Sequence, residues 1–465
     1  MVKLPEEFKN KYTHLLGQEE SERLFSALNL PERKAYRINQ LKIDTNVSYD
    51  QSKPIPNLTA SYYGEIDGTD PEWVGGSVYS QDPSAMFPAT LANIQPGEKV
   101  LDLCAAPGGK TTKLGESLAG KGLLVANEIS ATRVKALREN LERWGIDNAV
   151  VTNNDSFALA KVFPEFFDTI LVDAPCSGEG MFRKSEDAVN YWSQDYVMTC
   201  QARQKEILQE AMKMLKPGGK LVYSTCTFSP EEDEQIVAWL VAKYNLQIQK
   251  LPLENTTGIS YGHPEWTEQK LSDLQNTLRF WPQNNLGEGQ FLAVLKDQRK
   301  QEDTVLVSPK KQQRKRNNVG KGKLSKEEID YVSKVIEKFN LPEQLSSWKT
   351  LALNSNDHIF IPALDPKRLK GLKIINNGLE LGIMKKRRFE PGHQLAAVLS
   401  NLPQTETVEL IDKKQYDSYL HGETLQILNK LNGFVLVSFQ QKIFSFGKMT
   451  GNKQLKNFYP KGLRK

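Results

Sequence analysis

Cysteines and long apolar runs are scarce in this 465-residue sequence, and both absences narrow the class of protein. No apolar run approaches the roughly 20 residues that a helix needs to span a bilayer. The start, MVKLPEEFKNKYTHLL, lacks the apolar stretch and the cleavage site of a signal peptide. The four cysteines are spaced neither as a disulfide framework nor as a paired zinc site. We therefore expect a cytoplasmic monomer with no membrane partner and no metal. The role of each cysteine thiol must be judged separately.

Negative charge is scarce in the C-terminal third. Residues 298–465 carry 31 lysines and arginines against 16 aspartates and glutamates, a net charge of +15, whereas the whole chain carries only +5. The preceding part is therefore at −10. A basic segment on an acidic body is typical of a protein that binds a polyanion such as nucleic acid. A solvated lysine-rich surface would give the same charge, so both interpretations stay open.

The middle of the chain alternates between strand-like apolar runs and helical segments. The strand-like runs are residues 100–103, 122–127, 149–153, 169–172 and 220–224. This alternation predicts an α/β fold, with a parallel sheet covered by helices on both faces.

The remaining segments differ in composition, and they suggest a division into five parts. These are a small leader domain (1–75), the α/β domain (76–297), a basic linker too polar to bury a core (298–325), an α+β module (326–386) and a second module (387–465). Within the last part, GFVLVSFQQKIFSFGKM predicts a β-hairpin that ends near glycine.

A loop of small residues, DLCAAPGGKTT, follows the first predicted strand and precedes a helix. Such a loop lets the backbone approach a ligand at a helix N-terminus. The G-x-G-x-x-G fingerprint of dinucleotide sites is absent, and a Walker loop would need glycine at Cys104, ahead of Gly109 and Lys110. A P-loop-like nucleotidase therefore remains only a weak alternative.

Acidic residues end or follow the next predicted strands. They are Glu128, Asp155 and Asp173. Because the carboxyl ends of parallel strands share one edge of the sheet, these acids are placed to bind ribose hydroxyls, an adenine amine and an ammonium group. That set fits S-adenosylmethionine. Each acid alone could instead cap the helix that follows it.

Two cysteines follow neighbouring strands of the expected sheet, Cys176 in DAPCSGEG and Cys226 in YSTCTFSPEE. They should emerge side by side at the rim of the cofactor pocket. Two thiols at one pocket suit the methylation of cytosine at carbon 5, which is too electron-poor to accept a methyl group directly. A thiolate that adds to carbon 6 makes carbon 5 nucleophilic, and a second acid–base group must then help to remove the carbon 5 proton and expel the thiolate. Residue chemistry alone does not say which thiol attacks. For Cys200, and also for Cys104, we favour a small buried hydrophobe.

VLDLCAAPGGKTT, DAPCSGEGMFRK and YSTCTFSPEEDE closely resemble motifs of the Sun/Nop (NOL1/NOP2/Sun) family of RNA cytosine-C5 methyltransferases. YRINQLK resembles the RNA-contacting leader of that family. RRFEPGHQLA and the C-terminal GKMTGNKQLKNFYPKGLRK are similar to the RsmF subgroup, which has a PUA-like RNA-binding module and modifies small-subunit ribosomal RNA. The resemblance implies a Rossmann-like class I methyltransferase domain, with ribosomal RNA or an assembly intermediate as partner.

The resemblance also implies roles for individual residues. Cys226 is expected to be the nucleophile and Cys176 to assist release, with Asp173 near the cytosine ring and Lys110 orienting that carboxylate. The residues expected to bind S-adenosylmethionine are Cys104, Ala105, Ala106, Pro107, Gly108, Gly109, Lys110, Glu128, Arg133, Asp155 and Asp173. A ribosome-assembly factor that binds RNA, with methylation incidental or lost, is the alternative from a different class.

Overall fold

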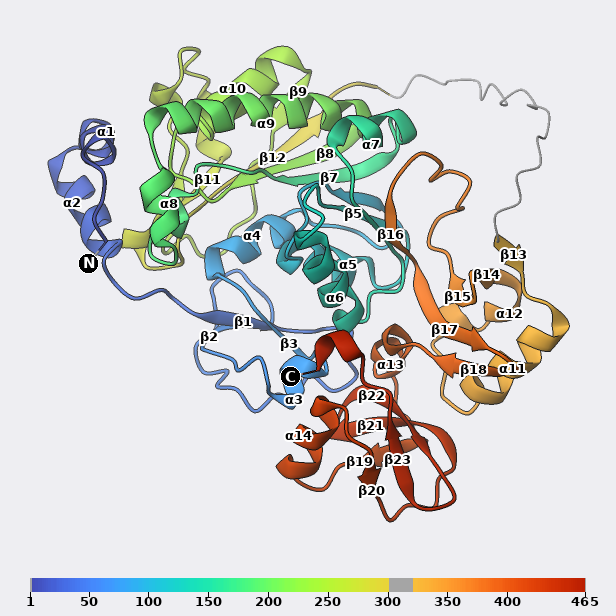
Figure 1. The fold of residues 1–465 in the computed structure, drawn as a ribbon. Helices are drawn as coiled ribbons and strands as arrows, with labels where there is room; N and C mark the ends of the chain where they lie inside the picture. The colour runs from blue at the N-terminus through green and yellow to red at the C-terminus, as the bar shows by residue number, and fades with distance from the viewer. Residues whose placement is uncertain (1, 301–320, 465) are drawn as a thin grey trace, which may run out of the picture.

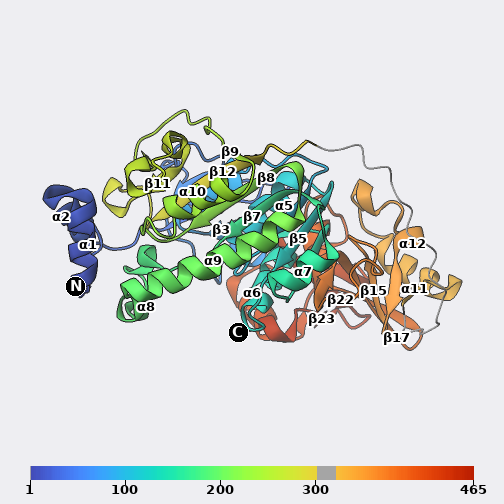
Figure 2. The ribbon, with the colours of Figure 1, turned by 90° about the horizontal axis from the view of Figure 1, so that it is seen from above.

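The computed structural model describes residues 2–300 and 321–464. Most of the predicted basic linker, residues 301–320, lies outside the described residues. Figure 1 shows a central sheet with helices above and below it, and the C-terminal strands gathered beside and beneath it. In Figure 2 the first two helices and the module that contains α11 lie at opposite ends of the molecule.

A ten-stranded sheet forms the centre, in the order β10-β11-β12-β8-β7-β4-β5-β6-β16, with β9 paired to β12. Its strands are β4 (Lys99–Asp102), β5 (Leu123–Asn127), β6 (Ala149–Thr152), β7 (Phe167–Asp173), β8 (Leu215–Thr225), β9 (Leu246–Ile248), β10 (Ser260–Tyr261), β11 (Leu278–Phe280), β12 (Gln290–Asp297) and β16 (Ile374–Asn377). Strands β6, β5, β4, β7 and β8 are neighbours in this order and pair in parallel, and β12 runs antiparallel beside β8. All five predicted strands are present, with ends shifted by a few residues.

Helices cover both faces of this sheet, which confirms the predicted α/β fold (Figure 1). One face packs against α4 (Pro83–Leu91), α5 (Gly109–Leu118) and α6 (Arg133–Trp144), and the other against α7 (Ser156–Val162), α9 (Gln194–Met214) and α10 (Glu234–Lys243). Neighbouring strand residues enter opposite cores: Val100 packs with the first set and Leu101 with the second. This alternation is the period-2 pattern of a strand buried on both sides.

The leader contains α1 (Glu6–Leu16), α2 (Gln18–Ala27) and α3 (Pro71–Val74). It also contains a three-stranded sheet of β1 (Ala35–Ile38), β2 (Ser61–Tyr63) and β3 (Val78–Ser80). The last of these strands lies beyond residue 75, where the sequence suggested a boundary. Phe8 of α1 packs against Phe182 and Trp192, from the segment between β7 and α9. The first helices therefore cover the loops that carry the cysteine motifs.

The C-terminal region contains two further five-stranded sheets. The first has β13 (Lys321–Lys323), β14 (Leu353–Ser355), β15 (His358–Ile361), β17 (Leu379–Lys385) and β18 (Arg388–Pro391), with α11 (Lys326–Ile336), α12 (Trp348–Leu351) and α13 (His393–Leu399) nearby. The second has β19 (Thr407–Glu409), β20 (Leu425–Gln426), β21 (Gly433–Phe439), β22 (Lys442–Met449) and β23 (Gln454–Asn457), with α14 (Lys413–His421). The predicted hairpin is confirmed as β21 and β22.

The C-terminal region contacts the rest of the chain through strand pairing and through hydrogen bonds from two lysine side chains. Strand β16 pairs with β6 and extends the central sheet. Lys42 of the leader donates to the carbonyl of Ala397 at 3.0 Å, and Lys442 of β22 donates to Asp44 at 3.0 Å. The suggested boundary after residue 386 falls in the turn between β17 and β18, which pair with each other. The domain limits therefore stay predictions.

Candidate active site

Parallel pairing of β7 and β8 brings the two cysteine motifs together. Asp173, the last residue of β7, is in register with Ser224 of β8, so both chains leave the sheet at the same edge. The Sγ atoms of Cys176 and Cys226 lie 3.4 Å apart. Both residues are partly exposed. Two thiols in contact at an open edge can share one reacting molecule.

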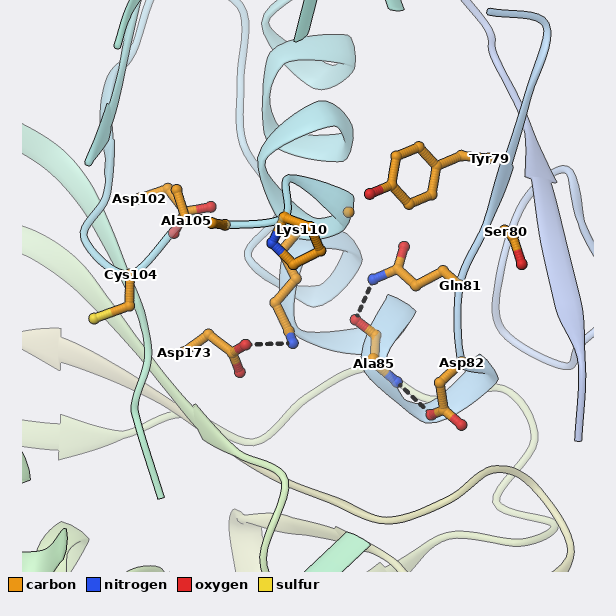
Figure 3. A pocket seen from close by; sticks show the side chains of 13 residues that line it. Tyr79, Ser80, Gln81, Asp82, Ala85, Asp102, Cys104, Ala105, Lys110 and Asp173 are labelled. Atoms are coloured by element: carbon orange, nitrogen blue, oxygen red, sulfur yellow. Dashed lines mark hydrogen bonds and ion pairs between the residues drawn. The ribbon is translucent and has the colours of Figure 1, made fainter. Parts of the chain in front are cut away.

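Lys110 and Asp173 form an ion pair beside the glycine loop (Figure 3). Lys110 Nζ is 2.7 Å from Asp173 Oδ2, and Ser224 Oγ donates to the other carboxylate oxygen at 2.7 Å. Burial alone would lower the pKa of Lys110. Asp173 outweighs it, with a further contribution from Cys226, so the pKa is raised. Lys110 therefore stays an ammonium group in the field of the Cys226 sulfur.

Different groups face the two thiols. The contact with Cys226 and then burial raise the pKa of Cys176, and the nearby Glu232 adds a smaller increase. An ammonium group favours a neighbouring thiolate, whereas a carboxylate and burial favour a neutral thiol. The surroundings of Cys176 therefore favour a thiol that keeps its proton, whereas Lys110 lies near Cys226.

A cavity of about 250 Å³ opens beside Lys110 (Figure 3). It is lined by Tyr79, Ser80, Gln81, Asp82, Ala85, Asp102, Cys104, Ala105, Ala106, Pro107, Gly109, Lys110 and Asp173. The loop from Cys104 turns into α5 at Gly108, whose φ of +115° is a conformation that favours glycine. The N-terminal end of α5 therefore meets the cavity.

Asp102 provides an unsatisfied acceptor in this cavity. It is the last residue of β4 and is 1% exposed. Its Oδ2 accepts a hydrogen bond from Thr111 Oγ1 at 2.7 Å, while Oδ1 is buried and has no hydrogen-bond partner within residues 2–300 and 321–464. Burial raises the pKa of Asp102 to about 7. A ligand that carries a positive donor would satisfy this oxygen.

Glu128, Arg133 and Asp155 do not line the cavity. Glu128 follows β5 directly and is buried, and its Oε2 lies 3.8 Å from Arg133. Arg133 also donates to the carbonyl of Ala106, so it links Glu128 to the glycine loop. Asp155 is exposed and accepts from the backbone N–H of Ala158 at 2.7 Å. Asp155 therefore caps the N-terminus of α7, which is the alternative role that the sequence left open.

The remaining two cysteines differ from each other. Cys200 is fully buried on α9, so its interpretation as a small hydrophobe is confirmed. Cys104 is partly exposed and lines the cavity, and burial of its sulfur raises its pKa.

Sequence reasoning missed six residues of the cavity, which are Tyr79, Ser80, Gln81, Asp82, Ala85 and Asp102. Asp102 ends the first strand of the sheet, and that position was the available signal. Tyr79 belongs to β3, and Gln81 and Asp82 follow it before α4; all three lie on the side of the cavity opposite Asp102 (Figure 3). Nothing in the local pattern of that segment pointed to a ligand.

Across the described ranges, we find no helix whose length and apolar character would let it cross a membrane. Among the same residues, no group of three or more histidine, cysteine, aspartate or glutamate side chains could hold a metal ion.

Comparisons with known proteins match successive parts of this chain. Residues 89–296 match the family described as 16S rRNA methyltransferase RsmB/F, and residues 4–83 the N-terminal domain of 16S rRNA methyltransferase RsmF. Residues 339–399 match the first C-terminal domain of RsmF rRNA methyltransferase, and residues 406–465 the methyltransferase RsmF PUA domain.

Relatives cover nearly the whole length. The chain is 33% identical to ribosomal RNA small subunit methyltransferase F of Vibrio vulnificus, over 99% of this chain and 98% of that protein. It is also 33% identical to the protein of that name from Vibrio parahaemolyticus, with the same coverage. A methyltransferase homologue from Pyrococcus horikoshii is similar in structure, with a TM-score of 0.56 and 30% identity over 62% of this chain and 94% of that one. The chain therefore belongs to the RsmF family of 16S rRNA methyltransferases.

Proposed function

We propose that the protein transfers a methyl group from S-adenosylmethionine to carbon 5 of a cytosine in small-subunit ribosomal RNA, through a covalent adduct with Cys226. The observation that carries this proposal is the contact of 3.4 Å between Cys176 and Cys226, with Lys110 beside Cys226. Family membership supports the methyl transfer and the RNA substrate. It leaves the nucleotidase interpretation without support.

The residues around the cavity fit S-adenosylmethionine. The unpartnered Asp102 oxygen suits the ammonium group of the ligand, and the start of α5 suits its carboxylate. Glu128, with Arg133 beside it, would accept hydrogen bonds from the ribose hydroxyls, and Asp155 would accept from the adenine amine. When bound, S-adenosylmethionine supplies an electrophilic methyl group.

The thiols divide the remaining chemistry. The Cys226 thiolate adds to carbon 6 of cytosine, and the electron pair of the carbon 5–carbon 6 double bond moves to carbon 5, which becomes nucleophilic. Cys176 can act as the base once it has lost its own proton to solvent, and after carbon 5 is methylated the carbon 5 proton passes to it. The C–H electron pair then re-forms the double bond as the bond to Cys226 Sγ breaks. Asp173, held by Lys110, would hold the cytosine ring.

The C-terminal region would hold the RNA. Lys385, Lys386, Arg387 and Arg388 are exposed in the turn between β17 and β18, and the PUA match follows this turn in the chain. Exposed arginines and lysines bind phosphates without reading the base. Because small-subunit ribosomal RNA lies in the cytoplasm, we propose that the protein acts there.

Bisulfite sequencing of 16S rRNA with and without the gene tests the reaction. We expect at least one cytosine that resists conversion in the presence of the gene and converts in its absence, because a methyl group at carbon 5 blocks the conversion. An assembly factor that only binds RNA would leave the two patterns identical. Re-expression of the gene is the control and should restore the resistant cytosine.

Removal of a cofactor carboxylate should weaken binding of S-adenosylmethionine. Replacement of Glu128 or of Asp155 by alanine should cost about 1–3 kcal/mol of binding free energy, because a ligand donor loses its acceptor. Titration calorimetry measures this change. For Asp155 the matched variant is asparagine, which still caps α7 but offers the ligand an amide in place of a carboxylate. If Glu128→Ala and Asp155→Asn both kept wild-type affinity, these residues would not belong to the cofactor site.

A further inference from the structure

Two buried glutamates lie next to the thiols without a role in the chemistry above. Glu179 follows Cys176 by three residues, and Glu232 follows Cys226 by six. Both have 0% exposure. A carboxylate is rarely buried unless several donors satisfy it. Its donors therefore indicate what each glutamate holds in place.

Glu179 holds the loop after Cys226, although it belongs to the loop after Cys176. The backbone N–H of Phe228 and the hydroxyl of Thr227 both donate to its Oε2 at 2.8 Å. The hydroxyl of Ser229 donates to Oε1 at 2.8 Å. Tyr12 of α1 and Trp192 complete the set, with bonds of 2.6 Å to Oε2 and 2.8 Å to Oε1.

Glu232 does the reverse: it belongs to the loop after Cys226 and holds the loop of Cys176. The backbone N–H of Ser177 donates to its Oε2 at 3.0 Å, and the Ser177 hydroxyl donates to its Oε1. Gln204 of α9 donates to Glu232 Oε2 at 2.7 Å and to the carbonyl of Pro175 at 3.1 Å. The residues that flank Cys176 on both sides are therefore fixed through Glu232 and Gln204.

The two loops also touch directly, since Ser177 Oγ and Thr227 Oγ1 lie 2.7 Å apart. We propose that Glu179 and Glu232 are positioning residues that form a reciprocal clasp, in which Glu179 orients the Cys226 loop for attack and Glu232 orients the Cys176 loop for release. This inference rests on the proposed covalent reaction. Neither carboxylate hydrogen-bonds to a cysteine sulfur, so each acts through the loop that it holds.

The clasp predicts that the two glutamates differ in their tolerance of glutamine. At Glu179, a backbone N–H meets one oxygen and the indole N–H of Trp192 meets the other. Neither donor can be reversed, so a glutamine amide group would face an N–H in either orientation. Glu179→Gln should therefore disturb the loop.

At Glu232, both N–H donors bind Oε2, and only the Ser177 hydroxyl meets Oε1. A hydroxyl can turn and accept, so glutamine fits there. Burial raises the pKa of Glu232 to about 8, and the protonated acid resembles glutamine in its hydrogen bonding. Glu232→Gln is thus the conservative variant, and Glu232→Ala removes the contacts.

The test uses the full-length protein with 16S rRNA transcribed from either cytidine or 5-fluorocytidine. A fluorine at carbon 5 cannot leave as a proton does, so the adduct persists and its rate of formation reports attack and methylation. On cytidine RNA, an adduct accumulates only when release is slow. Gel shift under denaturing conditions measures both, and calorimetry measures the affinity for S-adenosylmethionine.

We expect Glu179→Gln to slow adduct formation on 5-fluorocytidine RNA by about 10- to 100-fold, because a small displacement of a nucleophile has an effect of that size. Glu232→Ala should form that adduct at nearly the wild-type rate and accumulate an adduct on cytidine RNA. Glu232→Gln should behave like the wild type, as should Glu231→Gln, a control in the same acidic run whose side chain bonds Lys11 and Gln194. Affinity for S-adenosylmethionine should not change in any variant.

Milder variants keep the test decisive if a glutamate variant does not fold. Thr227→Ala and Ser177→Ala each remove one hydroxyl of the clasp, and they should reproduce the effects of Glu179→Gln and Glu232→Ala at smaller size. Equal effects on both steps, or no effect on either, would overturn the clasp and leave the covalent reaction standing. Absence of any wild-type adduct on 5-fluorocytidine RNA would overturn the proposed reaction and the clasp with it.

Discussion

Replacement of Cys226 by alanine is expected to abolish both the methylated cytosine and the covalent complex with RNA. Without a thiolate at carbon 6, carbon 5 remains too electron-poor to accept a methyl group. The loss should be about 10,000-fold or more, as for the removal of the attacking group in other enzymes that use a covalent nucleophile. Transfer of labelled methyl groups to 16S rRNA from a strain that lacks the gene measures the activity, and a denaturing gel measures the adduct.

Cys200→Ala is the matched control for this variant. It removes a thiol from the same domain, and that thiol lies buried on α9, outside the residues that line the cavity. Methyl transfer should persist in Cys200→Ala, and both variants should keep the wild-type affinity for S-adenosylmethionine. Methylation that survives in Cys226→Ala would show that Cys226 is not the nucleophile.

Local sequence patterns predicted those parts of the site that lie within one strand and the loop that follows it. Apolar runs of the right length gave the five parallel strands, and the small residues before Lys110 gave the loop that leads into α5. The contact between Cys176 and Cys226 also follows from sequence, because parallel neighbours end at the same edge of a sheet.

Features that depend on distant parts of the chain could not be predicted in this way. Strand β16 joins the central sheet more than 200 residues after β6, and no local signal shows where an edge strand will dock. The proximity of Lys110 to Cys226 arises only in the folded sheet, where Lys110 meets Asp173 at the end of β7, beside β8. The sequence alone therefore predicted a thiol pair but did not predict the order of their roles.

The acidic run SPEEDE illustrates the same limit. Its composition suggests a solvated surface, yet Glu232, Asp233 and Glu234 all have 0% exposure. Arg279 from β11 forms ion pairs with Asp233 and with Glu234, and Ser177 donates to Glu232. Charged residues are buried only with partners of this kind. Those partners lie 45 or more residues away in the chain, beyond the reach of a local pattern.

Replacement of Cys176 by alanine should have a different effect, the accumulation of a covalent protein–RNA complex. Attack by Cys226 and methylation of carbon 5 can still occur, but removal of the carbon 5 proton slows without a base at this position. Turnover should fall by about 100- to 10,000-fold, the range of general acid–base catalysis. On a denaturing gel, the protein should shift by the mass of the RNA in Cys176→Ala, but not in Cys226→Ala or in the double variant.

Comparison of the two single variants shows which of the two thiols attacks. If Cys176 attacked and Cys226 assisted release, the complex would accumulate in Cys226→Ala and would be absent from Cys176→Ala. The proposed order fits the surroundings of the two thiols better, because Lys110 lies near Cys226 whereas the contact with Cys226 and burial raise the pKa of Cys176. A neutral Cys176 can donate its proton and then accept the one from carbon 5, but it is a poor nucleophile. Methylation that persists in both single variants, with no complex in any of them, would exclude a thiol mechanism altogether.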